Sequence, residues 1–182
     1  MRYPDVTPHQ PAWVAAECER HAGPFPSAEA RMGLAVALAR ASAREGGGPF
    51  GAAVFDGAGR LLAPGVNLVR PAGCSVFHAE LVALMVAERV VGSHDLGTAG
   101  PVTLTSSAEP CAQCFGALPW AGIAALECGA RTADAEAVGF DEGPKPAEWA
   151  AALEARGIRV RRDVARGEAA AVIADYVASG GP

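Results

Sequence analysis

The spacing of the hydrophobic residues in the first half of the chain changes once, from a helical to a strand-like pattern. Behind Ser27, a residue type that caps helix N-termini, apolar residues recur at three- and four-residue steps over residues 28–45. Two short apolar runs follow, GAAVF and RLLAPGVN, and the segment DGAG between them contains an Asp-Gly pair that is typical of a hairpin turn. We therefore expect one helix followed by two antiparallel strands.

The second half alternates between helical and strand-like patterns. A helix is predicted from Phe77, because Leu81, Leu84 and Met85 fall on one helical face. The later segments predict the strands PVTLTS, IAALECGA and IRVRR and the helices CAQCFGALPWAG, PAEWAAALEARG and GEAAAVIADYVAS, with DAEAVGF as a short helix or turn. Strands that alternate with helices indicate a mostly parallel sheet covered on both faces. We expect an α/β protein of three α/β/α layers, with a five-stranded mixed sheet that begins in the hairpin.

The N-terminal segment has a different composition from the rest. Residues 1–26 carry five prolines around one amphipathic piece, WVAAECERH, and we expect an arm that lies on the domain. At 182 residues and 51% hydrophobic composition, the chain is long enough for one substantial core, so residues 27–182 are predicted to form a single domain. Neither an export signal nor an apolar stretch of about 18 residues is evident, which favours a soluble cytoplasmic protein without a membrane partner.

Charge and cysteine content narrow the function classes. The formal net charge is −5 and the only basic cluster is RVRR at 159–162, so the electrostatic signature of a nucleic-acid-binding protein is missing. A small neutral partner fits better. Five cysteines, an odd number without an export signal, argue against a disulfide framework and for reduced thiols that can act as ligands.

Two of these thiols, Cys111 and Cys114, lie one turn apart at the start of a predicted helix. Their spacing alone fits a redox couple, half of a structural metal site or part of a catalytic site. The positive end of the helix dipole favours thiolates, which bind zinc, and His78, at the start of another helix, is the histidine best placed to join them. A Zn²⁺ ion held by these three residues keeps a fourth position for a water molecule, which it acidifies.

Glu80 follows His78 by two residues and is the candidate proton carrier for that water. It should not bind the metal itself. Two alternatives remain open: His78 and Glu80 could serve only as an ordinary polar group and a dipole partner at a helix start, or Cys74 could be a fourth ligand. The second alternative makes a closed structural site with no room for water, in which Glu80 has no task.

The pairing of H-x-E with a downstream P-C-x-x-C is a signature of zinc deaminases. With these residues, the chain resembles the cytidine-deaminase-like superfamily, and within it the bacterial guanine deaminases, from about residue 28 to the end. The resemblance is carried by GGPFGAAVF, GVN, HAE, SAEPCAQCFGALPW, EAVGFDEGPKPAEW and, less closely, ADY at 174–176. It implies the cytidine-deaminase-like fold and a homodimer.

The resemblance also implies residues that hold a substrate. Glu142, the second of two paired acids, would grip the donor edge of a base and assist proton transfer. Tyr176 matches an aromatic residue that relatives place at the neighbouring subunit's pocket. The remaining implied contacts are the side chain of Asn67 and the backbone N–H of Ala79 to polar edges of the base, Phe50 and Trp120 as pocket walls, and Asp141 as the first paired acid.

These observations predict a zinc-dependent hydrolytic deaminase of a free nucleobase, with guanine converted to xanthine and ammonia. The alternatives within this class are s-triazine amines such as ammeline, and cytosine. A tRNA adenosine deaminase shares the zinc motif but should present a basic surface, which an acidic chain does not predict. A non-catalytic domain held together by zinc would leave Glu80 and Glu142 without a role.

Overall fold

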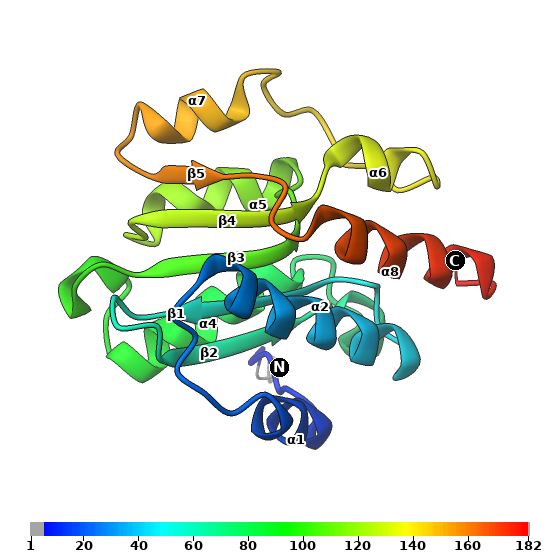
Figure 1. Ribbon diagram of the computed structural model, residues 1–182, viewed down its shortest axis with the longest axis horizontal. Helices are drawn as coiled ribbons and strands as arrows, with labels where there is room; N and C mark the ends of the chain where they lie inside the picture. Colours follow the sequence, from blue (N-terminus) through cyan, green and yellow to red (C-terminus); the bar gives the residue numbers. More distant parts are fainter. Residues whose placement is uncertain (1–5, 182) are drawn as a thin grey trace, which may run out of the picture.

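The computed structural model describes residues 6–181, which form a five-stranded sheet in the order β2-β1-β3-β4-β5 (Figure 1). The strands are β1 (Gly51–Phe55), β2 (Leu61–Val66), β3 (Thr103–Ala108), β4 (Ala125–Ala130) and β5 (Arg159–Arg161). Strand β1 runs antiparallel to both β2 and β3, whereas β3, β4 and β5 are parallel. The predicted mixed sheet is confirmed, but its parallel part is smaller than expected because β1 lies between β2 and β3 and opposes both.

Helices cover both faces of the sheet. Figure 1 shows α2 (Ala28–Arg44) and α8 (Arg166–Ala178) on one face and α4 (Ala79–Val91) and α5 (Ala112–Ala117) on the other, so the three-layer prediction is confirmed. The remaining elements are α1 (Ala12–Arg20), α3 (Val69–Ala72), α6 (Thr132–Glu136), α7 (Trp149–Glu154) and the 3₁₀ helices η1 (Leu96–Ala99) and η2 (Leu118–Trp120). Two of these, α3 and η1, have no counterpart among the predicted elements.

Local chemistry accounts for the ends of the first elements. The side chain of Ser27 accepts a hydrogen bond from the N–H of Ala30 at 3.1 Å, and α2 starts at the next residue. In the hairpin, Asp56 Oδ1 accepts hydrogen bonds from the N–H groups of Ala58 and Arg60, both at 2.9 Å, and this closes the turn between β1 and β2. The cap and the turn are therefore formed by the residues that predicted them.

The edge of the sheet at the carboxyl ends of β2 and β3 is where α4 and α5 begin. A Cβ atom on Gly65 of β2 would lie 2.2 Å from the carbonyl oxygen of Ala79, so a larger residue there would push the start of α4 off the sheet. Glycine thus allows the first turn of α4 to pack directly on β2. This packing brings His78 and Glu80 to the same edge as the segment that follows β3.

The N-terminal segment packs on the domain through α1. Val14 is buried in a cluster with Leu34, Leu38 and Phe55, so α1 contacts both α2 and the sheet. Residues 1–5 of the predicted arm lie outside the described residues, and the boundary after residue 26 stays a prediction. Among the helices of residues 6–181, none has the length and apolar character needed to cross a membrane.

Candidate active site

Three side chains that follow the sheet edge converge as a ligand set. His78 is the N-cap of α4, Cys111 is the N-cap of α5, and Cys114 lies in the first turn of α5. His78 Nδ1 is 3.4 Å from Cys111 Sγ and 3.6 Å from Cys114 Sγ, and all three donor atoms lie within 4.8 Å of one another. A tetrahedral zinc ion with bonds of about 2.3 Å to sulfur and about 2.0–2.1 Å to nitrogen separates such donors by about 3.5 Å. The donor types and their spacing therefore fit zinc.

The electrostatics of the two thiols also suit a cation. A hydrogen bond from Cys114, followed by one from His78, lowers the pKa of Cys111 to about 4. The same sulfur–sulfur hydrogen bond, together with burial, raises the pKa of Cys114, and the hydrogen bond to Cys111 raises the pKa of His78. The site thus favours a thiolate at Cys111, and a divalent cation would also favour deprotonation of Cys114.

Cys74 is not part of this ligand cluster within residues 6–181. We therefore expect Cys74→Ser to keep about one zinc ion per chain, because three ligands and an open position are typical of a catalytic zinc site. Cys111→Ser, by contrast, should lose most of the metal, since it removes the ligand that already carries negative charge. Metal content after gel filtration, measured by plasma mass spectrometry, tests both variants. Loss of zinc from Cys74→Ser would identify a closed structural site instead.

Glu80 lies beside the ligand set but outside it. It occupies the first turn of α4, it is only 6% exposed, and its carboxyl group lies close enough to Cys111 and His78 to interact electrostatically with both. Burial, and after it the negative charge of Cys111, raises the pKa of Glu80. A buried carboxyl group with a raised pKa next to an acidified water is suited to carry protons.

A cavity of about 250 Å³ opens next to these residues. His78, Glu80 and Cys111 are among the residues that line it. Five further predicted residues line the same cavity: Phe50, Asn67, Asp141, Glu142 and Tyr176. The fold therefore brings together side chains from positions 50 to 176 of the sequence, and a small flat molecule placed there would lie against the metal ligands.

Aromatic rings form a wall of the cavity. The rings of Phe50 and Phe140 meet edge to face with centroids 5.0 Å apart, and Phe140 stacks on Tyr176 at 6.3 Å with an interplanar angle of 29°. Tyr176 is buried in α8 and lines the cavity of its own chain. Such a wall offers a face on which a planar base can stack.

The polar groups of the cavity differ in how far the protein already uses them. Asn67 Oδ1 accepts a hydrogen bond from the N–H of Val69 at 3.2 Å, which leaves its amide NH₂ group for a molecule in the cavity. Asp141 Oδ1 accepts a hydrogen bond from the N–H of Gly143 at 2.9 Å and so shapes its own loop. The N–H of Ala79, between the two lining residues of α4, is in the first turn and has no intrahelical acceptor.

Glu142 is the buried member of the acid pair. It is 7% exposed, whereas Asp141 is exposed. Burial, and after it the charge of Cys111, raises the pKa of Glu142 to about 7. The two neighbouring acids therefore differ in burial, and with this pKa the protonation of Glu142 can change near neutral pH.

Trp120 does not lie where the sequence placed it. Its side chain is 75% exposed and lines a separate apolar hollow with residues of α4, and it is absent from the cavity beside His78 within the described chain. The predicted pocket wall at Trp120 is therefore corrected: the residue lies at the end of the 3₁₀ helix η2, which follows α5, and it lines the other hollow.

Other lining residues were not predicted as part of the site. They are Gly48, Val69, Arg70, Ala108, Glu109 and Phe140. The sequence contained a signal for Glu109: a charged residue directly after a buried strand and before Pro110-Cys111 is expected to be buried itself and to need a charged partner. Arg70 had none, since it lies on the unpredicted helix α3.

The sequence and the fold of the chain are similar to those of known deaminases. The family model of the cytidine and deoxycytidylate deaminase zinc-binding region matches residues 26–130. A guanine deaminase of Bacillus subtilis (strain 168) is 38% identical over 122 residues, which cover 63% of this chain and 75% of the relative. The guanine deaminase from Nitrosomonas europaea superposes with a TM-score of 0.90 and 41% identity, over 98% of this chain and 99% of that one. A structure of NE0047 in complex with 2,6-diaminopurine gives a TM-score of 0.88 at 43% identity, over 95% and 93% of the two chains.

Proposed function

The chain belongs to the cytidine and deoxycytidylate deaminase zinc-binding family and is a zinc-dependent hydrolytic deaminase, and we propose that its substrate is guanine, which it converts with water to xanthine and ammonia. The observation that carries this proposal is one cavity that combines the His78, Cys111 and Cys114 ligand set with the buried acids Glu80 and Glu142. Support for guanine comes from the two relatives named guanine deaminase.

The residues of the cavity divide the chemistry among them. When bound by His78, Cys111 and Cys114, zinc supplies the Lewis acidity that makes water a nucleophile near neutral pH. Glu80 takes one proton from the attacking water and gives it to a ring nitrogen, and it then takes the remaining proton of the added oxygen and gives it to the departing amine. A new C–O bond forms and the C–N bond breaks, so that water and guanine become xanthine and ammonia.

Binding of the base follows from the remaining groups. The wall of Phe50, Phe140 and Tyr176 can stack on a flat ring, and the free amide NH₂ group of Asn67 can donate to an acceptor on its edge. Glu142 can accept from ring N–H groups. A buried acceptor of this kind selects for the ring that carries the matching donor, because a ring without it leaves the acceptor unpaired.

A substrate panel tests the proposal directly. Zinc-loaded protein should release ammonia from guanine with kcat/KM at least about ten-fold higher than from ammeline, cytosine, adenine or the corresponding nucleosides. A higher rate on ammeline or cytosine would keep the reaction class and replace the substrate. If no free base released ammonia, the proposed function would be wrong.

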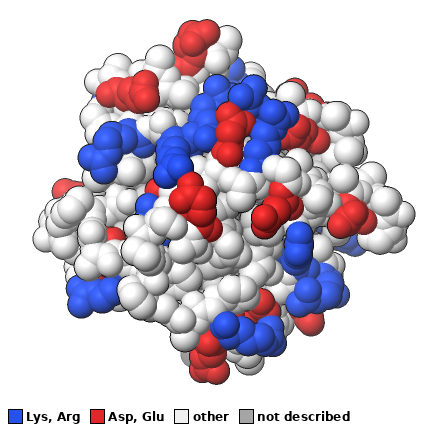
Figure 2. Space-filling view, in the orientation of Figure 1, with Lys and Arg blue, Asp and Glu red and all other residues white. Residues whose placement is uncertain are grey.

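The surface charge bears on the nucleic-acid alternative. On the face shown in Figure 2, Lys and Arg side chains gather in the upper part but surround and border Asp and Glu side chains, and the net charge of the chain is −5. Neutralising many phosphates requires a field of one positive sign, which this face does not present. We therefore propose that tRNA is not a substrate, and expect the protein to pass through an immobilised-tRNA column at moderate salt.

We also propose a homodimer that uses the apolar hollow beside Trp120. The hollow is lined by Val76, Leu81, Leu84, Met85, Glu88, His94, Ala117, Trp120 and Ala121. Contiguous apolar surface of this kind marks an interaction site. Because burial of an added carboxylate in a dimer contact costs desolvation free energy, Trp120→Glu should shift the protein from dimer to monomer in sedimentation velocity, whereas Val90→Glu, at an exposed apolar residue outside the hollow, should not. A monomeric unaltered chain would contradict the dimer.

We also propose that the enzyme is located in the cytoplasm, where its thiol ligands stay reduced.

A further inference from the structure

Lys145 is the only lysine among the 15 lysine and arginine residues of the chain. It lies three residues after Glu142 and is half-buried. Its Nζ donates to the carbonyl oxygen of Pro110 at 2.6 Å and to Thr132 Oγ1 at 2.5 Å, and it sits 5.1 Å from the ring centroid of Trp149. The ammonium group thus donates to two acceptors and also lies over an aromatic face.

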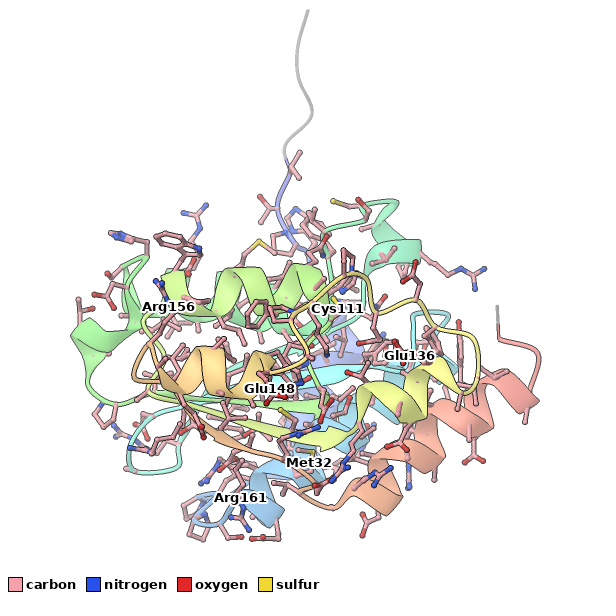
Figure 3. The ribbon with its side chains drawn as sticks, turned by 90° about the horizontal axis from the view of Figure 1, so that it is seen from above. Met32, Cys111, Glu136, Glu148, Arg156 and Arg161 are labelled. Atoms are coloured by element: carbon pink, nitrogen blue, oxygen red, sulfur yellow. The ribbon has the colours of Figure 1, made fainter. Side chains whose placement is uncertain are left out.

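These bonds join two segments of the candidate active site. We call residues 140–146 the acid loop, because they carry Glu142. In Figure 3 the chain between Glu136 and Glu148 passes beside Cys111, and two hydrogen bonds fix it there. The N–H of Ala112 donates to the carbonyl oxygen of Glu142 at 2.8 Å, and Lys145 Nζ donates to Pro110, the residue before Cys111.

Thr132, one of the two acceptors of Lys145, is itself held in place by hydrogen bonds. Glu109 is buried, and one carboxylate oxygen accepts from the N–H and the hydroxyl of Thr132, both at 3.0 Å. The other oxygen accepts from Arg162 Nε at 2.7 Å. Hydrogen bonds therefore run from Lys145 through Thr132 to Glu109 and Arg162, and they join the ends of β3, β4 and β5.

A lysine fits this position better than an arginine would. The acceptors on Pro110 and Thr132 belong to different segments, and a compact ammonium group with three donors can serve both while it remains near the Trp149 ring. The planar guanidinium group of arginine suits parallel acceptors on one group. The acid loop also contains Gly143 with φ of 68°, a left-handed conformation, and residues 143 and 144 are exposed, so the contacts of Glu142 and Lys145 on either side hold this part of the loop.

We propose that Lys145 is a positioning residue: it clamps the acid loop to the turn before Cys111 and thereby fixes the carboxylate of Glu142 in the cavity. The inference rests on the proposed guanine deaminase function. Lys145 is not among the residues that line the cavity, so we infer that it acts on the substrate through the loop that carries Glu142. Without the ammonium group the loop keeps the Ala112–Glu142 backbone bond and the packing of Phe140 on Phe50 and Tyr176, but it loses the side-chain hydrogen bonds that tie its second half to Pro110 and Thr132. Small displacements of a group that binds substrate cost about 100-fold in rate.

Steady-state kinetics of the zinc-loaded protein test this role. Lys145→Met should lower kcat/KM for guanine by about 10- to 100-fold with unchanged zinc content. Lys145→Arg should recover only part of the loss. In the Glu142→Gln background, the same Lys145→Met change should cost less than about two-fold, because its effect passes through the carboxylate. Equal costs in the two backgrounds, or no loss in the single variant, would overturn the inference.

A second measurement does not depend on catalysis. The N–H of Ala112 lies in the first turn of α5, so its protection reports the bond to Glu142. Hydrogen exchange at this amide should accelerate by about ten-fold in Lys145→Met and stay unchanged in Arg60→Met, which removes an exposed cation of the hairpin. Unchanged exchange in Lys145→Met would contradict the clamp. Inactivity of the unaltered protein on guanine would instead overturn the proposed function. The exchange rate of Ala112 would still show whether Lys145 holds the acid loop in place.

Discussion

Glu80→Gln is expected to lower ammonia release from guanine by about 10⁴-fold while the protein keeps its zinc. Glutamine has the size of glutamate, so the packing around this buried side chain should survive, but an amide cannot accept and return a proton. The metal should remain because Glu80 is not part of the ligand cluster formed by His78, Cys111 and Cys114. The loss should appear in kcat, since proton transfer belongs to the transition state.

The experiment compares kcat, KM and zinc content of Glu80→Gln with those of Glu168→Gln. Glu168 occupies the first turn of α8 as Glu80 occupies the first turn of α4, but it is exposed, and its variant should match the unaltered protein. A Glu80→Gln protein that kept more than about a tenth of its activity would rule out Glu80 as the proton carrier. Loss of zinc from this variant would instead make Glu80 part of the metal site.

Much of the fold could be predicted because its elements carry local signals. The cap at Ser27 and the Asp56 turn depend on neighbours within four residues, and the structure contains both. Helix α3 has only four residues, which is too short for a periodic pattern to develop. The central place of β1 depends on pairing with β3, about 50 residues away in sequence, and periodicity contains no information on strand order.

The same distinction holds in the candidate site. His78, Glu80, Cys111 and Cys114 could be found because each pair lies within one helical turn and the chemistry requires those residue types at that spacing. The orientation of Trp120 could not be found, because it depends on how the helix ends. The bonds that join Lys145, Thr132, Glu109 and Arg162 connect residues 13 to 53 positions apart, so they become visible only when the strands are assembled.

Glu142→Gln is expected to lower kcat/KM for guanine by about 10²- to 10³-fold, the second largest effect. The carboxylate of Glu142 is buried at the cavity, so it can accept N–H groups of the base, and its pKa of about 7 lets it exchange protons near neutral pH. Glutamine keeps one acceptor oxygen but replaces the other with a donor. That donor would face the donor edge of the base and leave buried N–H groups without acceptors.

The matched comparison is kcat/KM of a variant at the adjacent acid, Asp141. Asp141→Asn changes an exposed side chain whose Oδ1 accepts from the N–H of Gly143, and asparagine keeps that acceptor, so its kcat/KM should fall less than about ten-fold. In Glu142→Gln we expect KM to rise and kcat to fall together, because the carboxylate both binds the base and exchanges protons. If Asp141→Asn cost as much as Glu142→Gln, the effect would come from the conformation of the acid loop, and the assignment of substrate contact to Glu142 would be wrong.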